Sequence, residues 1–231
     1  MLKCDLHLHT RDDPQDGHGF LSIPHSAEEL IDHARSLGFD VLSITLHTKV
    51  FWSDRINAYA KKKGILLIPG CEMDIDHMHV LIYNADPNKL DRIVKNIQKE
   101  NTLAAIGKYK DDSLVIAPHT FYRHQLIRKR LGDVLEQHMK AFDAIEFCHF
   151  YYKFLTYNPP AKRLAEKYNL PLIGTGDVHR LYQMGYTFTI IDAKKDAKDV
   201  LTAIKKGKVK LVTQSMPLLL FIRHGIFSLI T

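Results

Sequence analysis

The sequence has few cysteines, and their spacing excludes one class of protein. Its 231 residues include three cysteines, an odd number, and no two of them form a Cys-x-x-Cys pair. This pattern argues against a disulfide-stabilised scaffold and favours a reducing, cytoplasmic compartment. The cysteines are Cys4, Cys71 and Cys148.

Long apolar runs and nucleotide-binding loops are also missing. The apolar stretch Pro217–Ile230 is interrupted by Arg223, His224 and Gly225, and it is shorter than the roughly 18 residues that a spanning helix needs. Met1 leads directly into an apolar strand, so we expect neither a signal peptide nor a membrane span. The absence of a Gly-x-Gly-x-x-Gly or Walker sequence argues against a nucleotide-binding fold.

The charge is moderately positive, but it is not arranged as a nucleic-acid surface. The formal net charge is +6, with 45% hydrophobic and 25% charged residues, which is typical of a soluble globular domain. No long block of Lys and Arg is interleaved with aromatic residues, so a nucleic-acid partner is not favoured. A small phosphorylated substrate is compatible with this charge.

The first strand organises the rest of the chain. His7 and His9 are two residues apart in an apolar segment, so they share one strand face about 7 Å apart, while Leu6 and Leu8, with Leu2 and Cys4, face the core. Two such imidazoles suit one metal ion or two adjacent ions. The alternative is a pair of surface histidines on an edge strand.

The same arrangement recurs along the chain and argues against that alternative. Further apolar strands are each followed by a residue type that binds metals: His47, Glu72, His119, Asp177 and His179. His79 differs because it precedes its strand, Val80–Tyr83.

Strands alternating with helical segments predict an α/β fold with a parallel sheet. An amphipathic helix is predicted over Arg123–Met139. Because candidate ligands leave most of the strands, the strand ends must converge, which favours a closed barrel with its site at the C-terminal ends of the strands.

Nitrogen and carboxylate ligands without thiolate favour zinc, manganese or iron. The set is too large for one tetrahedral ion, so two to three divalent metal ions are expected, bridged by a carboxylate such as Glu72. Such clusters generate hydroxide at neutral pH and hold both oxygens of a phosphoryl displacement.

The motifs D-L-H-L-H-T, I-T-L-H, P-G-C-E, H-V-L, A-P-H and G-D-V-H occur in this order. Together they resemble the polymerase and histidinol phosphatase (PHP) family, over residues 1–215, followed by a short apolar tail at 216–231. The resemblance implies a distorted (β/α)7 TIM-like barrel and the hydrolysis of phosphate esters by a trinuclear metal site.

The resemblance also implies ligand sets. His7, His9, Glu72 and Asp177 would hold one ion, His79 and His119 a second with Glu72 as the bridge, and His47 and His179 a third. Glu72, Asp177 and His179 would be the catalytic residues. The family usually has I-T-D-H where this chain has Leu46 before His47.

The family also expects an Asp or His soon after His-x-His. In this chain that loop is long, and Asp16 or His18, with Asp13 behind them, could supply the ligand. The sequence leaves this choice open.

Substrate contacts are predicted for Arg180, Arg123 and His149, because Arg recognises phosphate with two donors and His149 follows a strand. Glu146 could line the pocket or could have only a structural role. The sequence thus predicts a cytoplasmic, metal-dependent phosphoesterase acting by metal-bound hydroxide on a small phosphomonoester. A nuclease or nucleotide phosphoesterase and a non-catalytic PHP module are the alternatives, and the oligomeric state is not specified.

Overall fold

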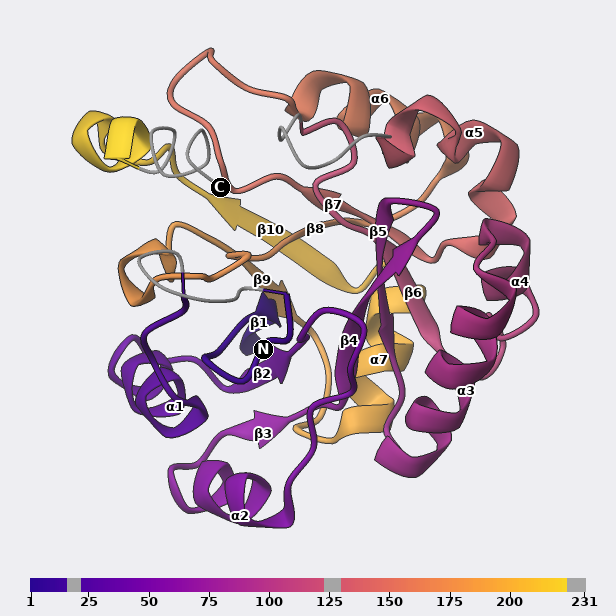
Figure 1. Cartoon of the computed structure of the whole chain (residues 1–231). Helices are drawn as coiled ribbons and strands as arrows, with labels where there is room; N and C mark the ends of the chain where they lie inside the picture. Colours follow the sequence, from indigo (N-terminus) through magenta and orange to yellow (C-terminus); the bar gives the residue numbers. More distant parts are fainter. Residues whose placement is uncertain (16–21, 123–129, 224–231) are drawn as a thin grey trace.

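Two five-stranded sheets form the centre of a mixed α/β fold (Figure 1). The computed structural model describes residues 1–15, 22–122 and 130–223. The first sheet has the order β10-β9-β1-β2-β3 and combines the two ends of the chain. Its strands are β1 (Leu2–Leu8), β2 (Val41–Ile44), β3 (Leu66–Leu67), β9 (Thr187–Ile191) and β10 (Val209–Thr213).

The second sheet comes from one continuous part of the chain, in the order β4-β5-β6-β7-β8. Its strands are β4 (Gly70–Ile75), β5 (Met78–Tyr83), β6 (Leu114–Ala117), β7 (Ala144–Phe147) and β8 (Leu172–Gly174).

The strand pairing is mixed, so the prediction of a parallel sheet is only half right. β1–β2, β2–β3, β6–β7 and β7–β8 are parallel, whereas β1–β9, β9–β10, β4–β5 and β5–β6 are antiparallel. Between β4 and β5 only Asp76 and His77 intervene, with φ of 49° and 65°. A two-residue turn with positive φ at both positions closes an antiparallel hairpin and cannot carry a parallel crossover.

The two sheets meet along two seams without joining into one continuous ladder. Among the described residues, isolated parallel bridges connect Leu8 with Val178 and His47 with Glu72. Named strands do not pair from one sheet to the other, so the predicted closed barrel is not formed as a single hydrogen-bonded sheet. The mixed α/β fold itself is confirmed.

A glycine lies at each seam. At Gly70, which begins β4, a Cβ atom would overlap the hydroxyl of Ser43 and lie 2.8 Å from Cγ2 of Thr45, next to β2. At Gly174, which ends β8, a Cβ atom would lie 2.8 Å from the backbone oxygen of Phe188 in β9. The absence of a side chain therefore allows the sheets to approach closely.

Among the described residues, the three largest apolar clusters are one between the sheets and two under the helices. Leu6, Leu81, Ile116 and Ile173 pack between the sheets with α7 (Ala197–Lys205). The first sheet packs against α1 (Ala27–Ser36) and α2 (Asp54–Lys62). The second sheet packs against α3 (Pro87–Glu100), α4 (Leu103–Gly107), α5 (Leu135–His138) and α6 (Asn158–Tyr168).

The first strand departs from simple alternation. Cys4 and Leu6 pack between the sheets, as expected, but Leu8 packs in the cluster beneath α1. The pairing of β1 with β2 shifts register between Asp5 and Leu8. Such an irregularity rotates the residues that follow it, which explains why Leu8 leaves the predicted face.

The predicted helix over Arg123–Met139 is wrong within the residues that are described. Residues 123–129 lie outside them, and 130–141 form a short 3-10 helix, Leu131–Asp133 (η2), then α5 and a second 3-10 helix, Met139–Ala141 (η3). The Gly132 amide donates to the Thr120 carbonyl, and a Cβ at Gly132 would collide with the ring of Phe121. This close tertiary contact outweighs the amphipathic pattern.

The start of the apolar tail docks on the body. Met216 is buried with Cys148 and Phe150, and the Phe221 ring stacks on that of Phe150 at 4.6 Å between centroids. Residues 218–223 are helical, and 224–231 lie outside the described residues. Within the described ranges, every helix is too short or too polar to cross a bilayer.

Candidate metal centre

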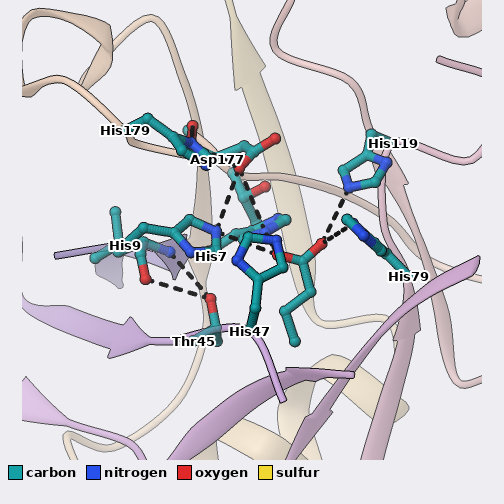
Figure 2. Close-up of polar contacts among 12 residues, drawn as sticks. His7, His9, Thr45, His47, His79, His119, Asp177 and His179 are labelled. Atoms are coloured by element: carbon teal, nitrogen blue, oxygen red, sulfur yellow. Dashed lines mark hydrogen bonds and ion pairs between the residues drawn. The ribbon is translucent and has the colours of Figure 1, made fainter. Parts of the chain in front are cut away.

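Eight predicted ligands converge beside the seams between the sheets (Figure 2). They leave the C-terminal ends of β1, β2, β6 and β8, except for two that lie on the β4–β5 hairpin. The eight are His7, His9, His47, Glu72, His79, His119, Asp177 and His179. The structure therefore brings them together, and their binding of metal stays a prediction.

Glu72 is the centre of this group and is 1% exposed. Its Oε2 lies 3.0 Å from Nε2 of His7 and 3.2 Å from Nε2 of both His9 and His47. Its Oε1 lies 2.8 Å from Nδ1 of His79 and 3.1 Å from Nε2 of His119. A carboxylate with imidazoles on both oxygens has the arrangement of a ligand shared between ions.

Asp177 adds a second carboxylate on the other side of the first-strand histidines. Its Oδ1 lies 3.5 Å from Nε2 of His7, 3.4 Å from Nε2 of His9 and 3.3 Å from Nδ1 of His179. Asp177 and His119 both have positive φ, 43° and 24°. Such backbone conformations are uncommon outside glycine and concentrate at functional sites.

Two further buried carboxylates contact the outer ring nitrogens of these histidines. Oδ2 of Asp13 lies 2.8 Å from Nδ1 of His9 and 3.1 Å from Nδ1 of His47. Oε1 of Glu146 lies 2.9 Å from Nδ1 of His7. An acceptor on one ring nitrogen fixes the tautomer and leaves the other nitrogen free to bind a metal.

In the loop after His9, the described residue that contacts the metal centre is Asp13. Asp16 and His18, the other candidates for this loop, lie outside the described residues, as does Arg123. Asp13 also accepts a hydrogen bond of 3.0 Å from the backbone amide of His47.

The electrostatics of the centre are strongly coupled. Burial alone would lower the pKa of His7 and His9, but the surrounding carboxylates outweigh it and hold both pKa values well above the ordinary range. Burial alone would raise the pKa of Glu72 and Asp177, but the histidines hold both well below the ordinary range. The carboxylates therefore make the space beside the His7 and His9 rings favourable for positive charge.

The donor set fits divalent metal ions. Nε2 of His9 is buried and makes no hydrogen bond of acceptable geometry to the described residues, although carboxylate oxygens of Glu72 and Asp177 lie within 3.4 Å. The described residues form five overlapping groups of three candidate ligands, and within each group the ligand atoms lie within 4.8 Å of one another. Among the described residues no cysteine belongs to these groups; burial raises the pKa of the Cys71 thiol well above normal, and its Sγ donates to the Leu46 carbonyl at 3.6 Å.

Two of the predicted substrate residues, His149 and Arg180, lie within the described part of the chain. His149 is buried just beyond β7. Arg180 is half-buried, and its guanidinium donates to the carbonyl oxygen of His179 at 2.9 Å. Arg180 is thereby tied to a residue of the centre.

Comparison with known proteins points to one family. The family model described as PHP-associated matches residues 156–209, which include α6, β8 and the Asp177–His179 turn. No curated protein matches the sequence.

Three solved structures share the fold over nearly the whole chain. PsfC from Pseudomonas syringae is 15% identical, with a TM-score of 0.67 and 99% of each chain covered. A "putative metal-dependent phosphoesterase" from Bifidobacterium adolescentis is 16% identical, with a TM-score of 0.56, covering 94% of this chain and 97% of that one. An amidohydrolase from Chromobacterium violaceum, with bound sulfate and no metal, is 13% identical, with a TM-score of 0.53 and 96% of each chain covered.

Proposed function

Because the chain belongs to the polymerase and histidinol phosphatase (PHP) family, we propose that it is a metal-dependent phosphoesterase acting on a small phosphomonoester. The observation that carries this proposal is Glu72, whose two oxygens face five imidazoles. A structural ion pair would need one partner, whereas this arrangement suits a carboxylate shared between cations.

The proposed ligand sets follow the geometry. His7, His9, Glu72 and Asp177 form one set, because both carboxylates approach Nε2 of the same two histidines. Glu72 with His79 and His119 forms a second set on its other oxygen. The third set consists of His47 and His179, whose ring centroids lie 6.3 Å apart, with Asp16 or His18 as candidates for its missing member and with Asp13 on the outer nitrogens of His9 and His47.

Bound divalent ions would supply a water of lowered pKa and would stabilise negative charge on the phosphoryl oxygens. The chain's own part is to hold and orient the reacting groups. Glu72 and Asp177 supply negative charge at the centre, and His179 is held by Asp177 at the rim. Arg180 has five N–H donors, so it can donate to phosphate while it remains bonded to the His179 carbonyl.

We also propose that the two sheets act as a distorted (β/α)7 TIM-like barrel. In support, apolar residues of both sheets pack against one another, and most candidate ligands leave C-terminal strand ends. The seams would then be the two places where the strand pairing around the barrel is interrupted.

The test measures metal and activity together. Protein prepared with supplemented zinc or manganese should contain two to three ions per chain and should hydrolyse p-nitrophenyl phosphate. His33→Ala removes an imidazole from α1, away from the centre, and serves as the control for loss of a histidine.

The outcomes separate the alternatives. One ion or none per chain would refute the cluster. Hydrolysis of bis-p-nitrophenyl phosphate or oligonucleotides in preference to monoesters would favour a nuclease. Full metal occupancy with no hydrolysis of monoesters, nucleotides or oligonucleotides would favour a non-catalytic module.

A further inference from the structure

Glu146 is a buried carboxylate on β7, behind the first-strand histidines. It is 1% exposed, although every other residue of β7 is apolar. Three donors converge on it from three other segments. Its Oε1 accepts from Nδ1 of His7 at 2.9 Å and from the hydroxyl of Thr175, and its Oε2 accepts from the backbone amide of His119 at 2.6 Å.

We propose that Glu146 is a positioning residue for the metal centre, which holds His7 in one tautomer and fixes the backbone of His119. The inference rests on the proposed metal centre. It adds to that proposal a residue that touches neither the central oxygens of Glu72 nor Asp177.

The first part of the argument concerns the proton on His7. A carboxylate facing three donors can only accept, so when a metal ion replaces the proton on Nε2 of His7, the remaining proton of the imidazole lies on Nδ1, toward Glu146. The lone pair then lies on Nε2, the atom that faces Glu72 and Asp177 at 3.0 and 3.5 Å. In metal sites this kind of outer hydrogen bond also restricts the rotation of the ring.

The second part concerns His119. Its φ is 24°, which is uncommon for a residue with a side chain. The hydrogen bond from its amide to Glu146 stabilises this turn at the end of β6. The turn directs the ring toward the other oxygen of Glu72, with Nε2 at 3.1 Å. One carboxylate thus positions a ligand of the first proposed set and a ligand of the second.

The chemistry of the site distinguishes a carboxylate from its amide. If Gln replaces Glu146 and directs its oxygen at His7 and Thr175, its NH2 group meets the amide of His119, donor against donor. If the amide is flipped, the NH2 group faces Nδ1 of His7, so the remaining proton moves to Nε2 and blocks the metal-binding nitrogen. Neither orientation satisfies both partners.

The experiment measures metal affinity rather than turnover. Full-length wild-type protein and Glu146→Gln are stripped of metal, then titrated with Co²⁺ and Zn²⁺, with the Co²⁺ d–d spectrum as the readout. Glu146→Gln should bind about 10–100-fold more weakly, as changes to the outer partners of ligating histidines do, and its Co²⁺ spectrum should change.

The matched control is Asp143→Asn, which removes a buried carboxylate directly before the first residue of the same strand. Asp143 accepts from the backbone amide of Val115 and contacts no residue of the centre. It should leave affinity and spectrum unchanged. A loss of affinity in Asp143→Asn equal to that in Glu146→Gln would overturn the positioning role, because a general structural effect would then explain both.

A second measurement uses only the wild-type protein, so it tests the inference even if Glu146→Gln does not fold. In the zinc-loaded wild type, ¹⁵N–¹H correlations of the imidazoles should show His7 protonated at Nδ1 and without a proton at Nε2. The opposite tautomer would overturn the inference, as would a Glu146→Gln that binds metal with wild-type affinity and spectrum. A wild type that binds no metal would instead refute the proposed function.

Discussion

Replacing Gly174 with Ala should loosen the seam between β8 and the first sheet. A Cβ at this position would lie 2.5 Å from Cδ1 of Leu211, 2.8 Å from the backbone oxygen of Phe188 and 2.9 Å from Cγ2 of Thr187. The φ of Gly174 is not in the left-handed range, so alanine can adopt the backbone and the cost is one of packing.

The neighbours differ in their ability to move. The tip of Leu211 can change rotamer, but Phe188 is paired with Val212 in the β9–β10 ladder, so its carbonyl cannot shift alone. The seam is also hydrogen-bonded: the Gly174 amide donates to the hydroxyl of Thr189 at 2.9 Å, and that hydroxyl donates back to the Gly174 carbonyl at 2.7 Å. Overpacking of this kind costs about 1–3 kcal/mol.

The assay is thermal unfolding of the metal-free protein, followed by circular dichroism. For a chain of this length, about 1 kcal/mol lowers Tm by about 2–4 °C, so the expected decrease is about 2–12 °C. Gly107→Ala is the matched control, because its nearest neighbour would be Cβ of Ala141 at 3.9 Å, and it should leave Tm unchanged or raise it. A Gly174→Ala protein that melts at the wild-type temperature would refute the close approach of the sheets.

Four further predictions follow from the buried groups and the caps. Asp177→Asn should lower phosphomonoesterase activity on the order of 100-fold or more while thermal melts change less; equal losses of activity and stability would contradict a role in the centre. In EDTA, the raised pKa of His7 and His9 gives stability that is complete below the ordinary value of 6.5 and is lost as pH rises through the raised values, so the free energy of unfolding in urea should fall as pH rises above 6.5. Ser26→Ala removes the capping box with Glu29 and should cost about 0.5–2 kcal/mol in the same urea assay, whereas an unchanged midpoint would mean that the cap adds nothing. DTNB at pH 8 should react with no thiol of the native protein and with three after unfolding, because all three are buried and burial raises their pKa: Cys4, Cys71 and Cys148.

The positions of most candidate ligands could be predicted because they lie at or near the end of an apolar strand, whereas Glu72 lies inside β4. Periodicity identifies such strands, and converging strand ends place the residues that follow them together. His79 shows the limit of this reasoning. The sequence places it just before Val80–Tyr83, and in the structure it lies near the start of β5, which runs antiparallel to β4.

The β4–β5 hairpin itself was missed, although a signal was present. Cys71 to Ile75 alternate apolar and polar residues, which is the period of a half-buried strand. The turn was hidden because Asp76 and His77 adopt positive φ without glycine. Antiparallel pairing of β9 with β1 depends on contacts across the whole chain, which local patterns do not contain.

The sequence carries a signal for the buried role of Glu146. An acidic residue inside an apolar strand is seldom buried without partners, so Ala144–Phe147 already implied a donor somewhere in the fold. The sequence could not identify the donors, because they come from His7, His119 and Thr175, which are far from it along the chain.

The continuity of the second sheet has a consequence for synthesis on the ribosome. All of its strands lie between Gly70 and Gly174, so it can pair as soon as that segment has emerged. In the first sheet, β1 lies between β2 and β9, so one edge of β1 stays unpaired until Thr187–Ile191 has been made. An unpaired edge is a site for wrong pairing with another chain. β1, which carries His7 and is translated before β2 to β10, is thus among the last of these strands to be enclosed, and nascent chains that stop before β9 should be the ones that aggregate or need a chaperone.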